Sequence, residues 1–245
     1  MRLIPSLLLL LVTSFSAYAE KLVDAKIILP RSYAAPGQVR QIIIKTTVKK
    51  GWHIYWKNPG ESGLAPSFTW HGDNYDIKKI HWPTPKAYTN AGILNNIYDG
   101  EVLFIADLLV KPGTKDGKID IKADIDFLVC KESCIMQSVK VSSTIEVNSK
   151  NMIETMQIHP LLSKAMDLLP RTVAITNKDI KGNKFSLDLP NNLHNKELYF
   201  AFDEDGIVMK QGNQKEGQFN FTSNEKTELK GLIISKEGPS WRVKN

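Results

Sequence analysis

The chain has 245 residues, of which 42% are hydrophobic, 24% charged and 9% aromatic. This composition is that of an ordinary globular protein, and it excludes a collagen, a low-complexity disordered chain and a small disulfide-rich scaffold. A chain of this length buries a large core, so it needs neither a metal nor a disulfide merely to fold. The net charge of +6 comes from basic residues spread along the chain, with runs no longer than Lys49-Lys50 and Lys78-Lys79. Nucleic-acid binding is therefore not expected.

The N-terminus has the pattern of a cleavable secretory signal peptide. Arg2 is followed by an apolar stretch centred on residues 7–12 and by small residues that end at Ala17-Tyr18-Ala19. A membrane anchor needs about 20 apolar residues, and this stretch is interrupted by Pro5 and by the polar residues 13–14. We predict that residues 1–19 are removed after Ala19 and that the remaining chain is exported to the periplasm of a bacterial-type cell envelope.

From residue 20 to about 148 the hydrophobic pattern is mostly of period two. Ile42, Ile44 and Val48 alternate with polar residues, and residues 101–110 form a second strand-like run. Glycine and proline clusters divide this region into roughly eight strands. These clusters lie at 35–37, 58–60, 63–66 and 111–113. Short strands at this spacing predict a β-sandwich over residues 20–150.

Residues 151–170 are predicted to form a helical connector. Their apolar residues fall at helical spacing, with an interruption at His159-Pro160. Beyond Pro170, strand patterns separated by turn residues return at 185–189, 198–202, 219–222 and 229–235. The prediction is an all-β fold, in which an immunoglobulin-like sandwich is followed by this connector and by a second, smaller β-domain over residues 171–245.

The chain has two cysteines, Cys130 and Cys134, and an exported protein is one in which a disulfide persists. The odd-numbered residues from 119 to 129 are apolar, so Cys130 falls on the alternate, mostly polar face, and Cys134 falls on the polar side of the next strand. Four residues along a straight strand span about 13 Å, which is too far for a disulfide. A turn at 131–133 would close that distance. The sequence therefore predicts a β-hairpin that carries both thiols at its tip, facing the same way, on the less buried side.

Three chemistries fit this cysteine spacing. A structural disulfide is disfavoured by its size, because closing a loop of about five residues removes only about 2 kcal/mol of unfolded-state entropy. A bond across so small a loop suits reversible thiol–disulfide exchange. The third is a Cu(I) site, because Cys130, Cys134 and Met136 are three soft sulfur donors. Zinc is less favoured, because a structural zinc site needs four ligands and the nearest histidines are far away in the sequence.

The charges near the pair do not identify the attacking cysteine. Lys131 favours a thiolate beside it, whereas Asp124, Asp126 and Glu132 disfavour one.

Aromatic residues gather upstream of the pair. We predict that Trp52, Trp56, Trp70 and Trp82 pack in the sandwich core rather than line a partner groove. Lone histidines among aromatics are usually structural, so no role is assigned to His53 or His81.

Four blocks of sequence surround and include the cysteine pair. They are GWHIYWKNPGESGL at 51–64, WPTP at 82–85, YDGEV at 98–102 and FLVCKESCI at 127–135. Together they resemble the N-terminal periplasmic domain of DsbD-type thiol:disulfide interchange proteins, and especially the ScsB-like branch. A weaker similarity to that branch continues from Leu169-Pro170 through YFAFDEDG at 199–206 to the end of the chain.

This resemblance implies an immunoglobulin-like sandwich that works as a component of a protein-disulfide reductase. Its dithiol would take electrons from a membrane thiol reductase and pass them to thioredoxin-fold proteins of the periplasm, with no cofactor and no small-molecule substrate. The resemblance also implies that Cys134 forms the mixed disulfide and that Cys130 resolves it. An aromatic-containing loop covers the pair in such domains, and the stretch 57–66 is a candidate for that loop.

Two departures from the family pattern change these expectations. Full-length relatives continue into a membrane domain and a thioredoxin-like domain, whereas this chain stops at Asn245, so its electron donor is expected to be another protein. Met136 stands where relatives commonly carry proline, which leaves open the alternative of a periplasmic Cu(I)-binding, copper-tolerance protein. A further alternative is a non-catalytic binding module in which the disulfide is structural.

Overall fold

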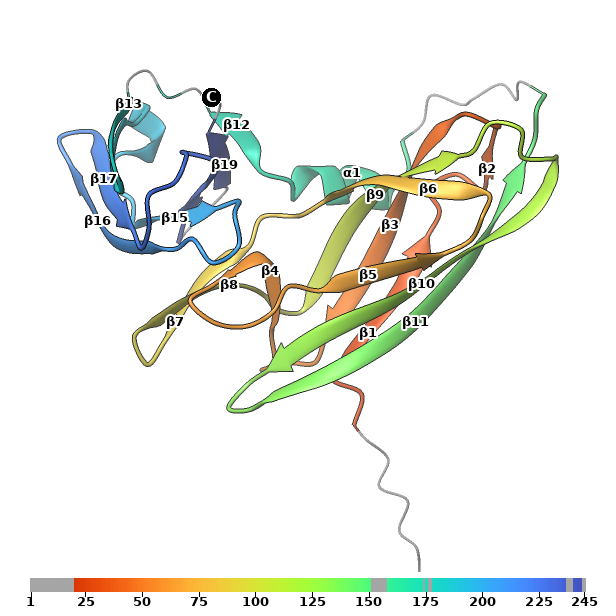
Figure 1. The fold of residues 1–245 in the computed structure, drawn as a ribbon, viewed down its shortest axis with the longest axis horizontal. Coiled ribbons are helices and arrows are strands. Elements are labelled where there is room, and N and C mark those ends of the chain that lie inside the picture. Colours follow the sequence, from red (N-terminus) through yellow and green to blue (C-terminus); the bar gives the residue numbers. More distant parts are fainter. Residues whose placement is uncertain (1–19, 151–157, 174, 176–177, 237–239, 244–245) are drawn as a thin grey trace, which may run out of the picture.

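The computed structural model describes residues 20–150, 158–173, 175, 178–236 and 240–243. The predicted signal peptide and the first part of the predicted connector lie outside these residues. Within them the chain forms nineteen strands, one α-helix and one short 3₁₀ helix (Figure 1). The prediction of an all-β fold is confirmed.

Two four-stranded sheets form the N-terminal sandwich. The first has the strand order β1-β3-β9-β6, and the second has the order β2-β11-β10-β5. The strands of the first sheet are β1 (Val23–Ile28), β3 (Val39–Val48), β6 (Tyr75–His81) and β9 (Glu101–Val110). Those of the second sheet are β2 (Tyr33–Ala34), β5 (Ser67–His71), β10 (Gly117–Cys130) and β11 (Cys134–Val147).

A smaller third sheet, with the order β4-β8-β7, lies at the end of the sandwich nearest the C-terminal part (Figure 1). Its strands are β4 (Ile54–Gly60), β7 (Lys86–Asn90) and β8 (Ile93–Tyr98). Residues 20–150 therefore contain eleven strands rather than the roughly eight predicted. The difference arises because short strands such as β2 and β7 carry too little hydrophobic alternation to be recognised from sequence.

The sandwich core is built by alternate residues of its long strands. Ile42 and Ile44 of β3 share one buried cluster with Phe104 of β9 and with Ile125 and Phe127 of β10. The inward face predicted for residues 119–129 is confirmed, since all its members from 121 onward are buried. Core packing is also confirmed for the four tryptophans. Trp56 is fully buried, and Trp52, Trp70 and Trp82 are partly buried and pack against the same cluster.

Helix α1 (Pro160–Asp167) begins where the sequence predicted an interruption of the connector. His159 precedes the helix, and its ring Nδ1 accepts a hydrogen bond from the backbone N–H of Leu161 at 3.2 Å. The helix packs on the outer face of the first sheet, where Ala165 joins Ile43 and Ile105 in a small buried cluster. The connector therefore also covers part of the sandwich. No helix in the described part of the chain is long and apolar enough to cross a membrane.

The C-terminal part forms two further four-stranded sheets, with the orders β12-β19-β18-β15 and β13-β14-β17-β16. Their elements are β12 (Arg171–Val173), β13 (Lys178–Lys181), β14 (Lys184–Asp188), the 3₁₀ helix η1 (Asn191–Leu193), β15 (Leu198–Phe202), β16 (Met209–Lys215), β17 (Gln218–Ser223), β18 (Gly231–Ser235) and β19 (Ser240–Val243). The phenylalanines of β14, β15 and β17 share a separate buried cluster. Four of these strands coincide with the runs predicted from sequence, whereas the domain boundaries at 150 and 170 stay a prediction.

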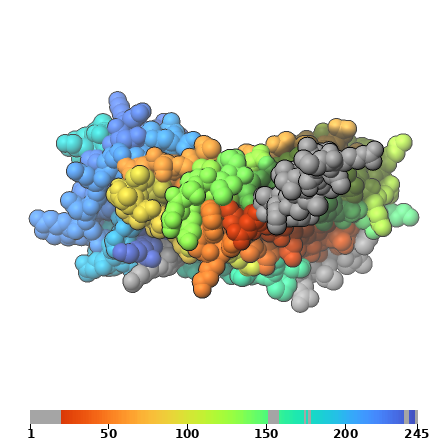
Figure 2. Space-filling view, turned by 90° about the horizontal axis from the view of Figure 1, so that it is seen from below, coloured from red at the N-terminus to blue at the C-terminus, as the bar shows by residue number. Residues whose placement is uncertain are grey.

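The two parts of the chain are joined through β4. Asn58 is fully buried, and its side-chain amide donates to the backbone carbonyls of Phe202, Glu204 and Ile207 at 2.9, 2.7 and 2.8 Å. Lys57 pairs with Asp203 at 2.7 Å. The cluster at 58–60, which the sequence indicated as a break between strands, is instead the end of β4 and part of this interface. Figure 2 shows the resulting elongated molecule, with the blue C-terminal part at one end.

Candidate functional site

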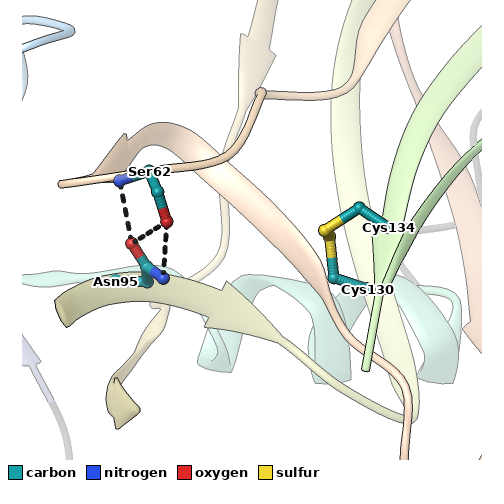
Figure 3. The surroundings of a disulfide bond; sticks show 4 residues. All are labelled: Ser62, Asn95, Cys130 and Cys134. Atoms are coloured by element: carbon teal, nitrogen blue, oxygen red, sulfur yellow. Dashed lines mark hydrogen bonds between the residues drawn. A yellow bond between two sulfur atoms is a disulfide. The ribbon is translucent and has the colours of Figure 1, made fainter. Parts of the chain in front are cut away.

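The two cysteines lie at the tip of the β10–β11 hairpin (Figure 3). Cys130 and Cys134 are directly opposite in the antiparallel register, with their Cα atoms 4.1 Å apart, and a disulfide joins them. The turn between them is closed by a hydrogen bond of 3.0 Å from the N–H of Lys131 to the carbonyl of Ser133. The predicted hairpin and its turn at 131–133 are confirmed.

The two cysteines differ sharply in exposure. Cys134 is exposed, whereas Cys130 is only 2% exposed. The prediction that both thiols lie on the less buried side is therefore wrong for Cys130. Its face of β10 carries polar residues further along the strand, but at the tip a second group of strands covers that face.

The cover over Cys130 comes from the third sheet. Tyr55 of β4 and Ile97 of β8, both buried, form a cluster with Cys130, and Leu128 packs against it. The candidate loop at 57–66 supports this cover from behind. A Cβ added to Gly63 would lie 2.3 Å from Tyr55 Cε1, so the backbone of Gly63 lies directly on the tyrosine ring. The aromatic residue against the pair is thus Tyr55, which precedes the candidate loop.

A polar cross-link holds the loop after β4 beside the disulfide (Figure 3). The N–H of Ser62 donates to Oδ1 of Asn95 on β8 at 3.1 Å, and the Asn95 amide donates to the Ser62 hydroxyl at 3.1 Å. Glu61 accepts a hydrogen bond from the N–H of Leu94 at 2.9 Å and pairs with Lys210 of the C-terminal part. These contacts keep Gly63 in place against Tyr55.

His53 lies next to Cys130 on the side away from Cys134. The two residues form an antiparallel bridge in which the N–H of each donates to the carbonyl of the other at 2.9 Å. The imidazole ring lies between Tyr55 and Tyr88, with ring centroids 5.3 Å away in both cases. Burial lowers the pKa of His53 below its usual value, although the carboxylate of Asp99 opposes this effect.

No role was assigned to His53 from the sequence. The available signal was its position in the block at 51–64, which resembles the same family as the block around the cysteines. His81 lies elsewhere, on β6, where it pairs with Asp107 at 2.8 Å.

Exposed apolar side chains occur on the segments around the pair. They belong to the loop after β4, to the β7–β8 hairpin and to the start of β11: Leu64, Tyr88, Ile93, Ile135 and Met136. Figures 1 and 2 place the yellow β7–β8 hairpin beside the green hairpin of β10 and β11. The exposed disulfide edge is therefore accompanied by apolar surface of the kind that contacts other proteins.

Met136 lies two residues beyond Cys134 on β11, opposite Leu128, and is 56% exposed. Neighbouring positions i and i+2 of a strand share a face, so Met136 and Cys134 point to the same side. Within the described residues, no group of three or more His, Cys, Asp or Glu side chains is arranged to hold a metal ion.

Asp124 and Asp126, which the sequence indicated as influences on the thiol pKa, interact with other side chains along β10. Asp124 pairs with His71 at 3.3 Å, and Asp126 accepts hydrogen bonds from Ser67 and Ser138. Because Asp126 lies four residues before Cys130 on a strand, it is about 13 Å from the tip. The charges closest in sequence to the disulfide are therefore Lys131 and Glu132 in the turn.

Comparison with known proteins agrees with this geometry. A sequence profile of the family described as "Thiol:disulfide interchange protein DsbD, N-terminal" matches residues 21–146, which is just over half of the chain. The N-terminal periplasmic domain of ScsB from Proteus mirabilis is similar in structure, with a TM-score of 0.60 and 21% sequence identity over 91% of this chain and 90% of that chain. At this identity the likeness shows a shared fold, and it extends over both β-parts.

A second structure, a variant of BcpA, the major pilin subunit of Bacillus cereus, aligns with a TM-score of 0.30 and 13% identity over 89% of this chain and 59% of that chain. That similarity is too low to support any argument. No curated protein matches the chain significantly in sequence. The profile match, which spans the sandwich and both cysteines, shows that this chain belongs to the DsbD N-terminal family of thiol:disulfide interchange proteins.

Proposed function

We propose that this chain is a periplasmic thiol–disulfide exchange protein that passes electrons through Cys130 and Cys134 to or from protein partners. The observation that carries the proposal is the asymmetry of the pair, in which one sulfur-bearing residue is exposed and the other is buried. A disulfide between residues already paired in one hairpin adds little to stability. An exposed cysteine with a protected neighbour suits a thiol that attacks a partner and a second thiol that resolves the product.

The exchange has two steps. In the reduced protein the Cys134 thiolate attacks a partner disulfide, so that a mixed disulfide forms and one partner sulfur leaves as a thiolate. Cys130 then attacks Cys134 Sγ, the bond between Cys134 and the partner breaks, and the intramolecular disulfide forms. Two electrons pass to the partner, and each partner sulfur takes up a proton at neutral pH. A donor dithiol reverses the sequence and regenerates the reduced protein.

The partners proposed are a membrane thiol reductase as donor and thioredoxin-fold proteins as acceptors. Family membership supports both, and the description of the ScsB relative as a periplasmic domain supports the compartment. The apolar residues around the tip favour a protein partner over a small molecule, because a small-molecule site would be a concave pocket.

The first experiment is a redox equilibration of the protein against glutathione buffers without metal, with free thiols counted by alkylation and mass spectrometry. A reduction potential between about −120 and −270 mV supports exchange. A potential below about −300 mV marks the bond as structural and overturns the proposal.

Trapping of partners gives a second test with a matched control. A Cys130→Ser variant keeps the exposed cysteine and cannot resolve, so it should accumulate mixed disulfides with partners. The Cys134→Ser variant keeps only the buried cysteine and should trap far less. Equal trapping by both variants would contradict the assignment of Cys134 as the attacking residue.

A further inference from the structure

The exchange proposed above requires a group that removes the thiol proton of Cys130. The side chain is packed against Tyr55, Ile97 and Leu128, and a buried thiolate is disfavoured because it loses its hydration. Attack on a mixed disulfide nevertheless requires a thiolate. A group beside Cys130 must therefore accept its proton at the moment of attack.

His53 is in position to do this. In an antiparallel bridge, directly opposite residues point to the same face, with their Cβ atoms about 5 Å apart. Cys130 has Cys134 opposite it on one side and His53 opposite it on the other. The three residues thus form a row across neighbouring strands. Once the disulfide is reduced, the Cys130 sulfur is released from Cys134, and rotation about its Cα–Cβ bond is the movement by which it would reach the imidazole side of this row.

The imidazole ring is held by ring contacts, and its nitrogens are available to accept a proton. The rings of Tyr55 on β4 and Tyr88 on β7 flank it, and the side chain is 9% exposed. Neither ring nitrogen hydrogen-bonds to another residue in the described part of the chain. Among the described residues, the charge that acts on His53 is the carboxylate of Asp99, after β8, which is itself paired with Lys86.

The protonation states of these neighbours suit the same role. Burial lowers the pKa of His53, so the imidazole is neutral at neutral pH and can accept a proton. Burial, together with Tyr88, raises the pKa of Tyr55, so that its phenol stays protonated and cannot serve as the base. Asp99 favours the protonated imidazole once it has formed.

We propose that His53 accepts the thiol proton of Cys130 when Cys130 resolves the mixed disulfide, a role that rests on the exchange function proposed above. The proton moves from Cys130 Sγ to a ring nitrogen as the Cys130–Cys134 bond forms. The bond between Cys134 and the partner breaks, and its electron pair leaves with the partner sulfur. The proton then passes from His53 to that sulfur or to water. In the reverse direction, protonated His53 donates to Cys130 as it leaves.

The test follows the two phases in which the reduced protein consumes an aromatic disulfide, dithiobis(nitrobenzoate). Attack by Cys134 releases the first coloured thiolate, and attack by Cys130 releases the second. At neutral pH we expect His53→Gln to slow the second phase by about 10²-fold, the lower end of the usual range for a general-base effect, and to leave the first phase unchanged. The deficit should shrink as the pH rises, because hydroxide then ionises the thiol without help.

His81→Gln is the matched control, because His81 of β6 is paired with Asp107 of β9 in the first sheet, whereas the cysteine pair belongs to the second sheet. Both phases should be unchanged in this variant. The role of His53 is overturned if its substitution leaves the second phase unchanged, slows both phases in proportion, or slows the second phase equally at every pH.

If His53→Gln does not fold, the pH dependence of the second-phase rate in the wild-type protein tests the proposal. With His53 as the base, the second-phase rate should level off above the pKa of the imidazole, and a rate that rises continuously with the first power of hydroxide overturns the role. Absence of the first phase would overturn the exchange function as well. Two rapid phases in both His53→Gln and wild type would remove only the role of His53.

Discussion

The side-chain amide of Asn58 donates a hydrogen bond of 2.9 Å to the backbone carbonyl of Phe202, 144 residues later in the sequence. The same nitrogen also reaches the carbonyls of Glu204 and Ile207. Because β4 leads directly from His53 and Tyr55 to Asn58, the strand that covers the disulfide is fastened at its far end to the C-terminal part. This gives the C-terminal part a structural connection to the cysteine pair.

Asn58→Ala should destabilise the protein strongly. The substitution removes the donor to the buried backbone carbonyls of Phe202 and Ile207, whereas the carbonyl of Glu204 still accepts a hydrogen bond from the N–H of Ile207 at 3.4 Å. Each buried acceptor that loses its partner costs about 1–3 kcal/mol. We expect the free energy of unfolding to fall by at least about 2 kcal/mol in urea denaturation followed by tryptophan fluorescence. Asn74→Ala, at an exposed position, is the control and should stay close to wild type. An Asn58→Ala protein as stable as this control would show that the three contacts contribute nothing.

Gly63→Ala should displace Tyr55 from Cys130. The added methyl would meet the tyrosine ring at 2.3 Å in a backbone conformation with φ of +100°, and overpacking of this kind costs about 1–3 kcal/mol. In a Cys134→Ser background, alkylation of Cys130 should become faster. Gly113→Ala is the control, because Gly113 has a similar φ of +84° but an added Cβ there would meet nothing within 4 Å. It therefore shows the effect of backbone strain without the clash. Equal alkylation rates in the two variants would contradict the role of Tyr55 as a cover.

The packing of α1 on the sandwich should weaken at acidic pH, because Glu101 then becomes protonated. Its hydrogen bonds from Lys164 of α1 and from Lys45 of β3 lower the pKa of Glu101 to about 2. The ionised carboxylate therefore stabilises the fold at pH values above the ordinary glutamate pKa of 4.5. This contribution is lost as the pH falls from about 4.5 toward 2. Solvent screens the pairs, so each contributes no more than about 1 kcal/mol.

Comparison of Glu101→Gln with wild type in urea at several pH values checks this expectation. The stability difference should be present at pH 6 and should disappear near pH 2. Glu225→Gln, at an exposed position without an ion pair in the described structure, should show no such dependence. A constant difference across the pH range would rule out the ionic origin.

Met136→Leu should separate thiol exchange from copper binding. Leucine preserves the volume of the side chain, and thiol–disulfide exchange makes no use of the thioether, so the two kinetic phases and the reduction potential should not change. If the reduced protein is instead a Cu(I) site, loss of one soft donor should weaken Cu(I) binding in competition with a colorimetric chelator. Met166→Leu, on α1 and 46% exposed, is the control. Weakened binding in Met136→Leu alone would favour the copper alternative.

The local features of the site could be predicted because they depend on neighbouring residues. Alternation along 119–129 places its apolar side chains in the core, and a three-residue turn sets Cys130 opposite Cys134. Both follow from the two-residue period of a strand and the short reach of a hairpin. The interruption at His159-Pro160 was likewise visible, although only the structure identifies it as the start of α1.

The burial of Cys130 depended on the tertiary structure alone. Alternation assigns a residue to one face of a strand, but it does not say whether other strands cover that face. Here β4 and β8, which come from residues 54–60 and 93–98, cover the tip, and the bridge between His53 and Cys130 forms between residues far apart in the sequence. Pairings of this kind leave no periodic signal in either segment. The sequence by itself therefore determined that two cysteines meet at a hairpin tip, whereas only the folded chain decided which one is exposed and which histidine lies beside the other.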